Sequence, residues 1–158
     1  MIDCIIFSRN RANQLNLLLE SLYLNSNNIF SKIHVLFTWS DPEFYKGYLK
    51  LFKRYPEVIW TCERGFRYSG IEMIQGCGDV VCLMVDDDVF YRKTNLSSNI
   101  ITEVLNHIPG SVFSFRLGTN ITVGDNFTNQ PVQQPQFQNL AYEGKDIALV
   151  WKNENYHS

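Results

Sequence analysis

Three consecutive carboxylates are the part of this chain best suited to chemistry. The apolar run VVCLMV at residues 80–85 is followed directly by Asp86, Asp87 and Asp88. A short apolar run rich in β-branched residues predicts a strand that is buried on both faces. Because an unpaired charge is very costly inside a core, the aspartates must emerge at the carboxyl end of this strand. Their mutual repulsion there favours the binding of a divalent cation.

Strand-like and helix-like segments alternate along most of the chain. Apolar runs predict strands at residues 3–7, 32–38, 58–62, 80–85, 111–117 and 147–151. Helices are expected between the first five of these strands, at residues 15–22, 42–55, 71–75 and 98–108. This order is typical of an α/β fold, a three-layer sandwich with a mostly parallel, Rossmann-like sheet.

The turns after the predicted strands carry helix caps and cationic side chains. Ser8 or Asn10 would cap the first helix, and Ser40 or Asp41 would cap the second. A basic, aromatic turn is expected at residues 66–68. Because the carboxyl ends of parallel strands share one edge of a sheet, the first two turns are expected to lie level with the aspartates.

Residues 118–140 differ in character from the rest of the chain. Asn, Gln, Thr and Gly dominate this stretch, which favours a long loop before the last strand. We interpret residues 1–158 as one domain. Its residues 1–117 would form a ligand-binding half, and residues 118–158 part of a second half.

Composition narrows the classes of function. The chain has 158 residues and a formal net charge of −2, which argues against a general nucleic-acid binder. No apolar run is long enough to span a membrane, and the first apolar run is too short for a signal peptide, so we expect a soluble, cytoplasmic protein. The four cysteines form no CxxC pair, which favours reduced thiols. The three histidines lack the spacing of metal ligands, and we interpret them as structural or exposed.

The order of these features resembles the family 2 inverting glycosyltransferases. The shared features are a polar turn after the first strand, a capped helix after the second, a glycine turn after the third and an Asp-x-Asp set after the fourth. The matching positions are Asn10-Arg11, Ser40-Asp41, Gly65, Asp86 and Asp88. The resemblance covers residues 2–117. It implies a GT-A fold and transfer of a hexose from a nucleoside-diphosphate sugar to a glycan, lipid or protein acceptor, with Mn²⁺ or Mg²⁺ as cofactor.

The resemblance also assigns roles to individual residues. Asp86 or Asp87 would face the ribose of the donor, and Asp86 and Asp88 would hold the metal that bridges the diphosphate. Hard oxygen ligands of this kind select Mg²⁺ or Mn²⁺ over zinc. We also keep the tryptophan before the second helix as an aromatic that could stack on a base or a sugar. The predicted donor-binding residues are Ser8, Arg9, Arg11, Trp39, Arg64, Arg67, Asp86 and Asp87.

Two features depart from the family pattern. The family's acidic residue at the end of the second strand is missing, because residues 36–38 are Leu-Phe-Thr. The catalytic base of the family is a carboxylate in the second half of the domain, and here it stays unassigned among Asp125, Glu143, Asp146 and Glu154.

The chain is also short for this fold, so we expect the donor half without much of the acceptor half. An apolar surface exposed in this way would allow two chains to pair as a homodimer.

Two other functions fit the same aspartates. Residues 86–90, Asp-Asp-Asp-Val-Phe, resemble the Asp-x-Asp-x-Val motif of haloacid dehalogenase-type phosphatases, with Phe90 in place of the final valine. Asp86 would be the nucleophile and Asp88 the general acid, with magnesium between them. That motif ends the first strand of its fold, whereas three predicted strands precede it here. The other alternative is a non-catalytic module that binds a nucleotide or a metal, since no catalytic base is assigned.

Overall fold

The computed structural model contains two compact units, Met1–Pro109 and Gly110–Ser158. It describes residues 1–107, 112–115, 137–142 and 144–151. The first unit contains the predicted strands and helices that flank the three aspartates. The second contains a strand pair near the end of the chain.

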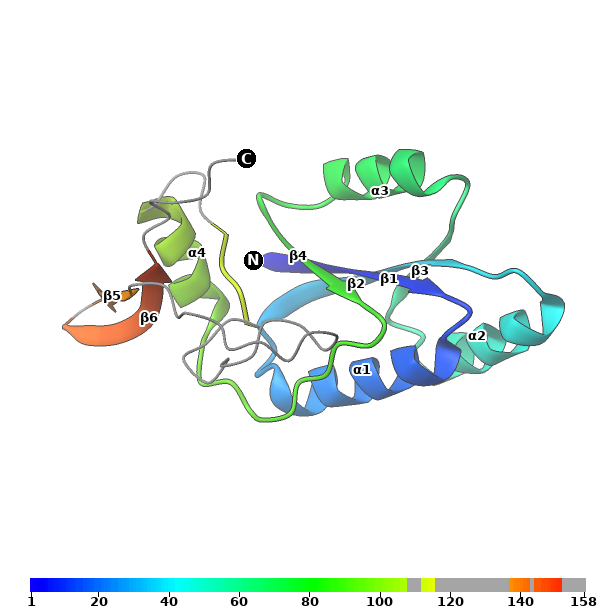
Figure 1. The fold of residues 1–158 in the computed structure, drawn as a ribbon, viewed down its shortest axis with the longest axis horizontal. Helices are drawn as coiled ribbons and strands as arrows, with labels where there is room; N and C mark the ends of the chain where they lie inside the picture. Colours follow the sequence, from blue (N-terminus) through cyan, green and yellow to red (C-terminus); the bar gives the residue numbers. More distant parts are fainter. Residues whose placement is uncertain (108–111, 116–136, 143, 152–158) are drawn as a thin grey trace, which may run out of the picture. The chain divides into compact units, whose positions relative to one another are not determined.

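A four-stranded, all-parallel sheet forms the centre of the first unit (Figure 1). Its strands are β1 (Ile2–Arg9), β2 (Phe30–Thr38), β3 (Ile59–Cys62) and β4 (Val80–Val85), in the spatial order β3-β2-β1-β4. The chain therefore moves outward from β1 to β3 and then returns to place β4 on the other side of β1. Such a reversal of strand order is where open α/β sheets bind their ligands, at the carboxyl ends of the strands.

Helices cover both faces of this sheet. The helices of the first unit are α1 (Ala12–Asn25), α2 (Pro42–Arg54), α3 (Phe66–Gln75) and α4 (Ser98–His107). Figure 1 shows α1 and α2 on one face of the sheet and α3 on the other. The predicted α/β fold with three layers and a parallel sheet is confirmed. Every helix in the described ranges is too short or too polar to cross a lipid bilayer.

The core of the first unit follows the alternation of side chains along β1. Cys4 and Ile6 point toward α1 and α2, where they join the four buried leucines of α1. Ile5 points to the opposite face and packs with Leu36 and Met73 beneath α3. Each buried leucine contributes roughly 1.5–3 kcal/mol relative to an exposed one, so the α1 face is the main anchor of this unit.

The helix starts were predicted with mixed success. Asp41 caps α2, since its side chain accepts a hydrogen bond from the backbone N–H of Glu43 at 2.8 Å, with Pro42 in the first turn. The predicted caps of α1 are wrong, because its N-cap is Arg11 and no side chain caps the helix. Ser8 instead belongs to β1, and the side chain of Asn10 bonds to the next turn along the sheet edge.

The helix α3 is longer than predicted, and the turn expected at residues 66–68 is its first turn. The helix begins directly after Gly65, whose φ of +123° is open to glycine and strained for other residues. Its buried residues are Ser69, Gly70 and Met73. Because two of these three residues are small, the buried face of α3 lacks the apolar spacing by which a helix is predicted from sequence.

The described part of the second unit is an antiparallel pair of strands. These are β5 (Phe137–Tyr142) and β6 (Lys145–Trp151), joined through Gly144 with φ +74°. The predicted last strand is therefore confirmed, whereas the loop predicted over residues 118–140 is wrong at residues 137–140. The strand predicted at residues 111–117 is wrong for the described residues 112–115, which form no strand and include Val112 with 89% exposure. Residues 116–136 lie outside the described ranges, and the single domain with two functional halves stays a prediction.

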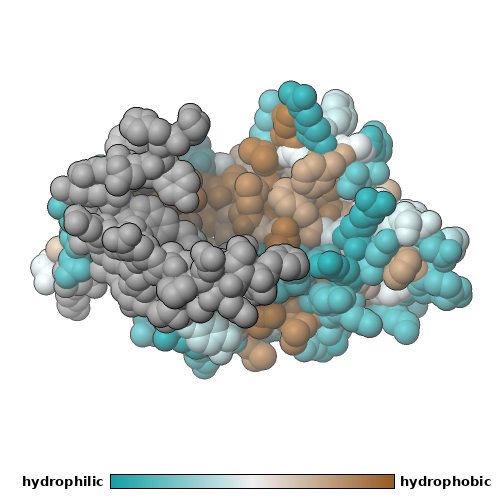
Figure 2. Space-filling view, viewed as in Figure 1, coloured by the Kyte–Doolittle hydropathy of each residue, from teal (hydrophilic) through white to brown (hydrophobic). Residues whose placement is uncertain are grey.

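The prediction that residues 80–85 form a strand buried on both faces is wrong in its burial, because β4 is an edge strand of the described sheet and none of its residues is buried. Leu83 is 57% exposed and Val85 is 41% exposed. Figure 2 shows hydrophobic residues gathered at the surface in the region of β4, between α3 and α1. Apolar surface of this kind is what the predicted pairing of two chains would require, and that pairing stays a prediction.

Candidate functional site

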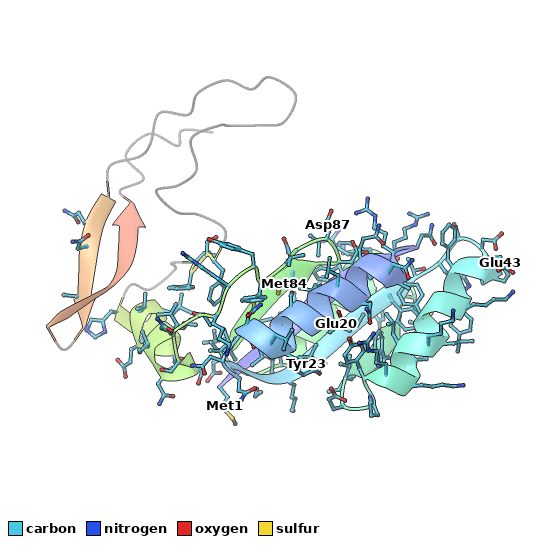
Figure 3. The ribbon with its side chains drawn as sticks, turned by 90° about the horizontal axis from the view of Figure 1, so that it is seen from below. Met1, Glu20, Tyr23, Glu43, Met84 and Asp87 are labelled. Atoms are coloured by element: carbon cyan, nitrogen blue, oxygen red, sulfur yellow. The ribbon has the colours of Figure 1, made fainter. Side chains whose placement is uncertain are left out.

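A cavity of about 600 Å³ opens at the carboxyl edge of the sheet, where the ends of β1 and β4 lie side by side. Five of the eight predicted donor-binding residues line it: Ser8, Arg9, Arg11, Asp86 and Asp87. Figure 3, viewed from the side of α1 and α2, shows Asp87 at the loop that follows β4. The sheet therefore brings together two segments that are more than 70 residues apart in the chain.

Asp86 is the buried member of the three aspartates, with 5% of its surface exposed. Its backbone N–H continues the β1–β4 ladder by donating to the carbonyl of Phe7 at 3.1 Å. Its carboxylate accepts a hydrogen bond from the backbone N–H of Arg9 at 3.3 Å and lies 3.6 Å from Nη1 of Arg11. These contacts fix the Asp86 carboxylate against the end of β1, because a buried carboxylate requires paired donors.

Arg11 connects the two aspartates that line the cavity. The same Nη1 that lies near Asp86 donates a hydrogen bond to Oδ2 of Asp87 at 3.1 Å. The side chains of Arg11 and Asp87 are both more than half exposed. The guanidinium thus relieves the repulsion between two adjacent carboxylates, and its exposure leaves it within reach of a ligand in the cavity.

Asp88 has a different environment from its two neighbours. Its backbone N–H donates to the carbonyl of Val85 at 3.1 Å, and its carboxylate accepts from the backbone N–H of Val85 at 3.0 Å. These bonds close the turn after β4. Among the described residues, the three aspartates are not a set whose oxygens converge within 4.8 Å of one another. They do not form a closed cage for a metal in this arrangement.

A buried hydroxyl on α2 holds the turn between β1 and α1. The oxygen of Tyr48 lies 2.8 Å from Oγ of Ser8, and it accepts a hydrogen bond from the backbone N–H of Arg11 at 3.2 Å. Tyr48 is fully buried. Burial, with a further contribution from the charge of Asp86, raises the pKa of this hydroxyl and keeps it protonated. Tyr48 was not predicted as a site residue, because its position on the apolar face of a helix marked it only as core.

Asn10 links the turn after β1 to the turn after β2. Its side chain donates to Oγ of Ser40 at 2.8 Å and accepts from the backbone N–H of the same residue at 2.9 Å. Its backbone has φ +60°, a left-handed conformation that asparagine tolerates better than most residues. The two turns that the sequence placed at one edge are therefore joined directly.

The remaining predicted donor-binding residues lie outside the cavity lining. Trp39 stacks on Tyr45 with ring centroids 4.4 Å apart and belongs to an aromatic cluster on the α2 side. Arg64, which precedes α3, and Arg67, which lies within it, both have exposed side chains. Glu63 and Phe66 from the same region line the cavity instead. The candidate bases Asp125, Glu143, Asp146 and Glu154 are outside the described side chains.

Comparison with known proteins finds one similar protein with a described activity. The chain is 31% identical over 131 residues to the bifunctional glycosyltransferase pgtA of Dictyostelium discoideum. The match covers 77% of this chain and 17% of that protein, so the chain spans about a sixth of the length of its relative. No protein-family model matches the chain, and no solved structure matches it.

Proposed function

We propose that this chain is the donor-binding portion of a metal-dependent glycosyltransferase, of the hexosyltransferase type and with the GT-A variant of the α/β fold. Its ligand would be a nucleoside-diphosphate sugar bound in the cavity at the ends of β1 and β4. The observation that carries the proposal is the meeting of Arg9 and Arg11 with Asp86 and Asp87 at the point where the strand order reverses. This is the place where open α/β sheets bind nucleotides, and it offers cations and carboxylates together.

The similarity to a bifunctional glycosyltransferase supports the same class of reaction. The chain covers 17% of that relative, so the similarity extends to part of a larger enzyme. An acceptor site, a catalytic base and the choice of sugar would come from other residues. We propose further that the whole enzyme to which this portion belongs transfers the sugar to a glycan, lipid or protein acceptor.

The aspartates fit a metal that is shared with the substrate. Mg²⁺ and Mn²⁺ prefer oxygen ligands, and Mg²⁺ commonly keeps several waters and binds through one or two carboxylates plus the phosphates of the substrate. A set of aspartates that does not converge is compatible with such binding. Asp86 and Asp88 would hold the ion, which would neutralise the charge that develops on the departing nucleoside diphosphate.

The chain's own residues would bind and orient the donor. The exposed guanidinium of Arg11 would move from Asp87 toward the diphosphate, since both are anions within its reach. Phe66, which is 59% exposed and packs edge-on against Phe7 with centroids 5.2 Å apart, offers an apolar wall to the nucleoside. The buried Asp86 would remain fixed by the backbone of Arg9 while the ligand binds.

Calorimetry with uridine and guanosine diphosphates, with and without Mn²⁺, tests the proposal. Binding is expected only with the metal, and Asp88→Asn is expected to abolish it. Asparagine keeps an oxygen that can accept from the backbone of Val85, so this substitution removes charge while leaving the turn closed. Asp79→Asn is the matched control, because Asp79 is an exposed aspartate just before the amino end of β4.

Three outcomes would count against the proposed function. Absence of nucleotide binding to the folded chain would exclude a donor site. Hydrolysis of a generic phosphate ester that Asp86→Asn eliminates would favour the phosphatase alternative. If nucleotide binds and neither hydrolysis nor transfer to any acceptor is found in the intact protein, the non-catalytic alternative would be favoured.

A further inference from the structure

Three side chains of metal-binding type lie together on the face of the sheet that α3 covers. They are Asp3 on β1, His34 on β2 and Cys77 just after α3. One ligand atom from each, a carboxylate oxygen, a ring nitrogen and Sγ, lie within 4.8 Å of one another. The cluster lies toward the amino end of β1, whereas the donor cavity lies at the carboxyl end.

The register of the sheet brings the first two residues together. His34 is the direct partner of Ile5 in the β1–β2 ladder. Asp3 lies two positions before Ile5, so alternation along the strand places Asp3 and His34 on the same face. Cys77 reaches this face because α3 ends at Gly76, and Cys77 packs with the small core cluster of Ile5 that lies beneath α3.

The carboxylate of Asp3 is already held in place by neighbouring donors. Asp3 is 6% exposed, its Oδ1 accepts a hydrogen bond from Oγ of Ser31 at 2.5 Å, and its Oδ2 accepts from the backbone N–H of Gly78 at 3.1 Å. Hydrogen bonds of this kind orient the carboxylate ligands of metal sites. Each carboxylate oxygen can accept more than one bond, so capacity for an ion remains.

One ring nitrogen of His34 is not hydrogen-bonded within the described part of the chain. Its Nε2 is buried and has no hydrogen-bond partner among the described residues. A buried polar atom left in this state costs about 1–3 kcal/mol, which is why such atoms are rare in folded proteins. Burial also lowers the pKa of His34, which favours the neutral imidazole that binds metals.

We propose that Asp3, His34 and Cys77 form a binding site for a divalent transition metal, with zinc as the best match. Mixed oxygen, nitrogen and sulfur ligands suit zinc and disfavour Mg²⁺ and Mn²⁺. Zinc bonds of about 2.0–2.3 Å require the three ligand atoms to move closer together, by adjustment of their side chains. A fourth position is left for water, as is usual for zinc with three protein ligands.

The charges at this site balance with the ion present. Binding replaces the thiol proton of Cys77 with a metal–sulfur bond and releases that proton to solvent. One thiolate and one carboxylate then neutralise the charge of a divalent ion. The ion would tie β1, β2 and the connection from α3 to β4 together. Its expected role is to stabilise the first unit, on the opposite edge from the donor cavity.

Titration with Co²⁺ in the presence of excess Mg²⁺ tests this site in the full chain. Excess Mg²⁺ competes for the aspartates after β4, which are oxygen ligands, and does not compete for a thiolate. Co²⁺ is expected to bind with one equivalent, to give a thiolate-to-metal absorption band, and to be displaced by Zn²⁺. A reductant without thiol groups keeps the four free cysteines of the described chain reduced.

Cys77→Ser should remove the band, and His34→Gln should weaken Co²⁺ binding by more than about tenfold, since even residues behind the ligands contribute 10- to 100-fold. Cys62→Ser is the control, because Cys62 is an exposed thiol on β3 that is not part of the cluster. Circular dichroism shows which variants are folded. An unchanged band in folded Cys77→Ser, or no band in the folded wild-type chain, would overturn the proposal. Neither result depends on whether the chain binds a nucleotide.

Discussion

Replacement of Tyr48 by phenylalanine removes a single hydroxyl that holds the wall of the donor cavity. The ring is fully buried and would keep its packing in the core. What is lost is the hydrogen bond with Ser8 at 2.8 Å and the one from the backbone of Arg11 at 3.2 Å. Each contributes about 0.5–1.5 kcal/mol, and the Ser8 hydroxyl is left buried without this partner. We expect the free energy of unfolding to fall by about 2 kcal/mol.

Denaturant unfolding measures this loss, and nucleotide titration measures its effect on the site. With its two ties removed, the turn from Ser8 to Arg11 must be ordered by the ligand. Affinity for the nucleoside diphosphate with Mn²⁺ should therefore fall about three- to tenfold, or roughly 0.7–1.4 kcal/mol. Tyr45→Phe is the matched control on the same helix, since the hydroxyl of Tyr45 has no hydrogen bond within the described residues. It should change stability by less than about 0.5 kcal/mol.

Equal stability losses in the two variants would refute the structural reasoning. The hydroxyl of Tyr48 would then contribute no more to stability than the hydroxyl of the half-buried Tyr45. A large loss of stability in Tyr48→Phe with unchanged nucleotide affinity would refute a different step. It would show that the turn after β1 is held by Tyr48 but takes no part in binding the ligand.

Two further predictions concern Arg11, which lines the cavity, and Gly65, which precedes α3. Arg11→Gln should weaken diphosphate binding about tenfold, or roughly 1.4 kcal/mol, because a charged hydrogen-bond donor is lost. Arg67→Gln is the control, since it changes an exposed arginine on α3 and should have little effect in the same titration. Equal losses of affinity in the two variants would indicate a general effect of charge. Gly65→Ala should destabilise the chain by about 1–2 kcal/mol in denaturant unfolding, because φ is +123° there, although the added methyl group meets no atom within 4 Å. Gly70 lies inside α3, where an added methyl group also meets no atom within 4 Å, so Gly70→Ala should stabilise the chain by about 0.5–1 kcal/mol. A shared sign of the two effects would contradict the backbone argument.

The sheet and the place of the aspartates could be predicted because both depend on local patterns. A strand of a parallel sheet favours a continuous apolar run, and residues 80–85 supply one. The predicted burial of both its faces is wrong, because β4 lies at an edge of the described sheet. Because unpaired charges cannot enter the core, the aspartates must follow the carboxyl end of this strand. The position of Asp86 at the edge of the sheet could therefore be predicted without knowing the fold. The four buried leucines of α1 also follow a local pattern, the spacing of residues on one face of a helix. These features were visible because each is carried by neighbouring residues.

The features that were missed depend on contacts between distant segments. Tyr48 meets Ser8 across 40 positions, and a helix pattern shows only that its ring is buried. His34 was interpreted as structural because its sequence neighbours include no ligand. Asp3 joins it only through the register of β1 and β2, and Cys77 only through the place where α3 ends. A shift of one residue in that register would turn the two side chains to opposite faces, and sequence alone does not fix it.

The charge distribution at the cavity explains why metal and nucleotide should bind together. A divalent ion alone would approach two carboxylates that already share the charge of Arg11, and it would place two cations close together. A diphosphate alone would meet Asp86 and Asp87 and be repelled by both. With both ligands bound, Arg11 would donate hydrogen bonds to the diphosphate and the ion would lie beside the aspartates, so that each charge would have a partner. Because coupling between two ligands is reciprocal, Mn²⁺ should raise the affinity for the nucleotide by the same factor as the nucleotide raises the affinity for Mn²⁺.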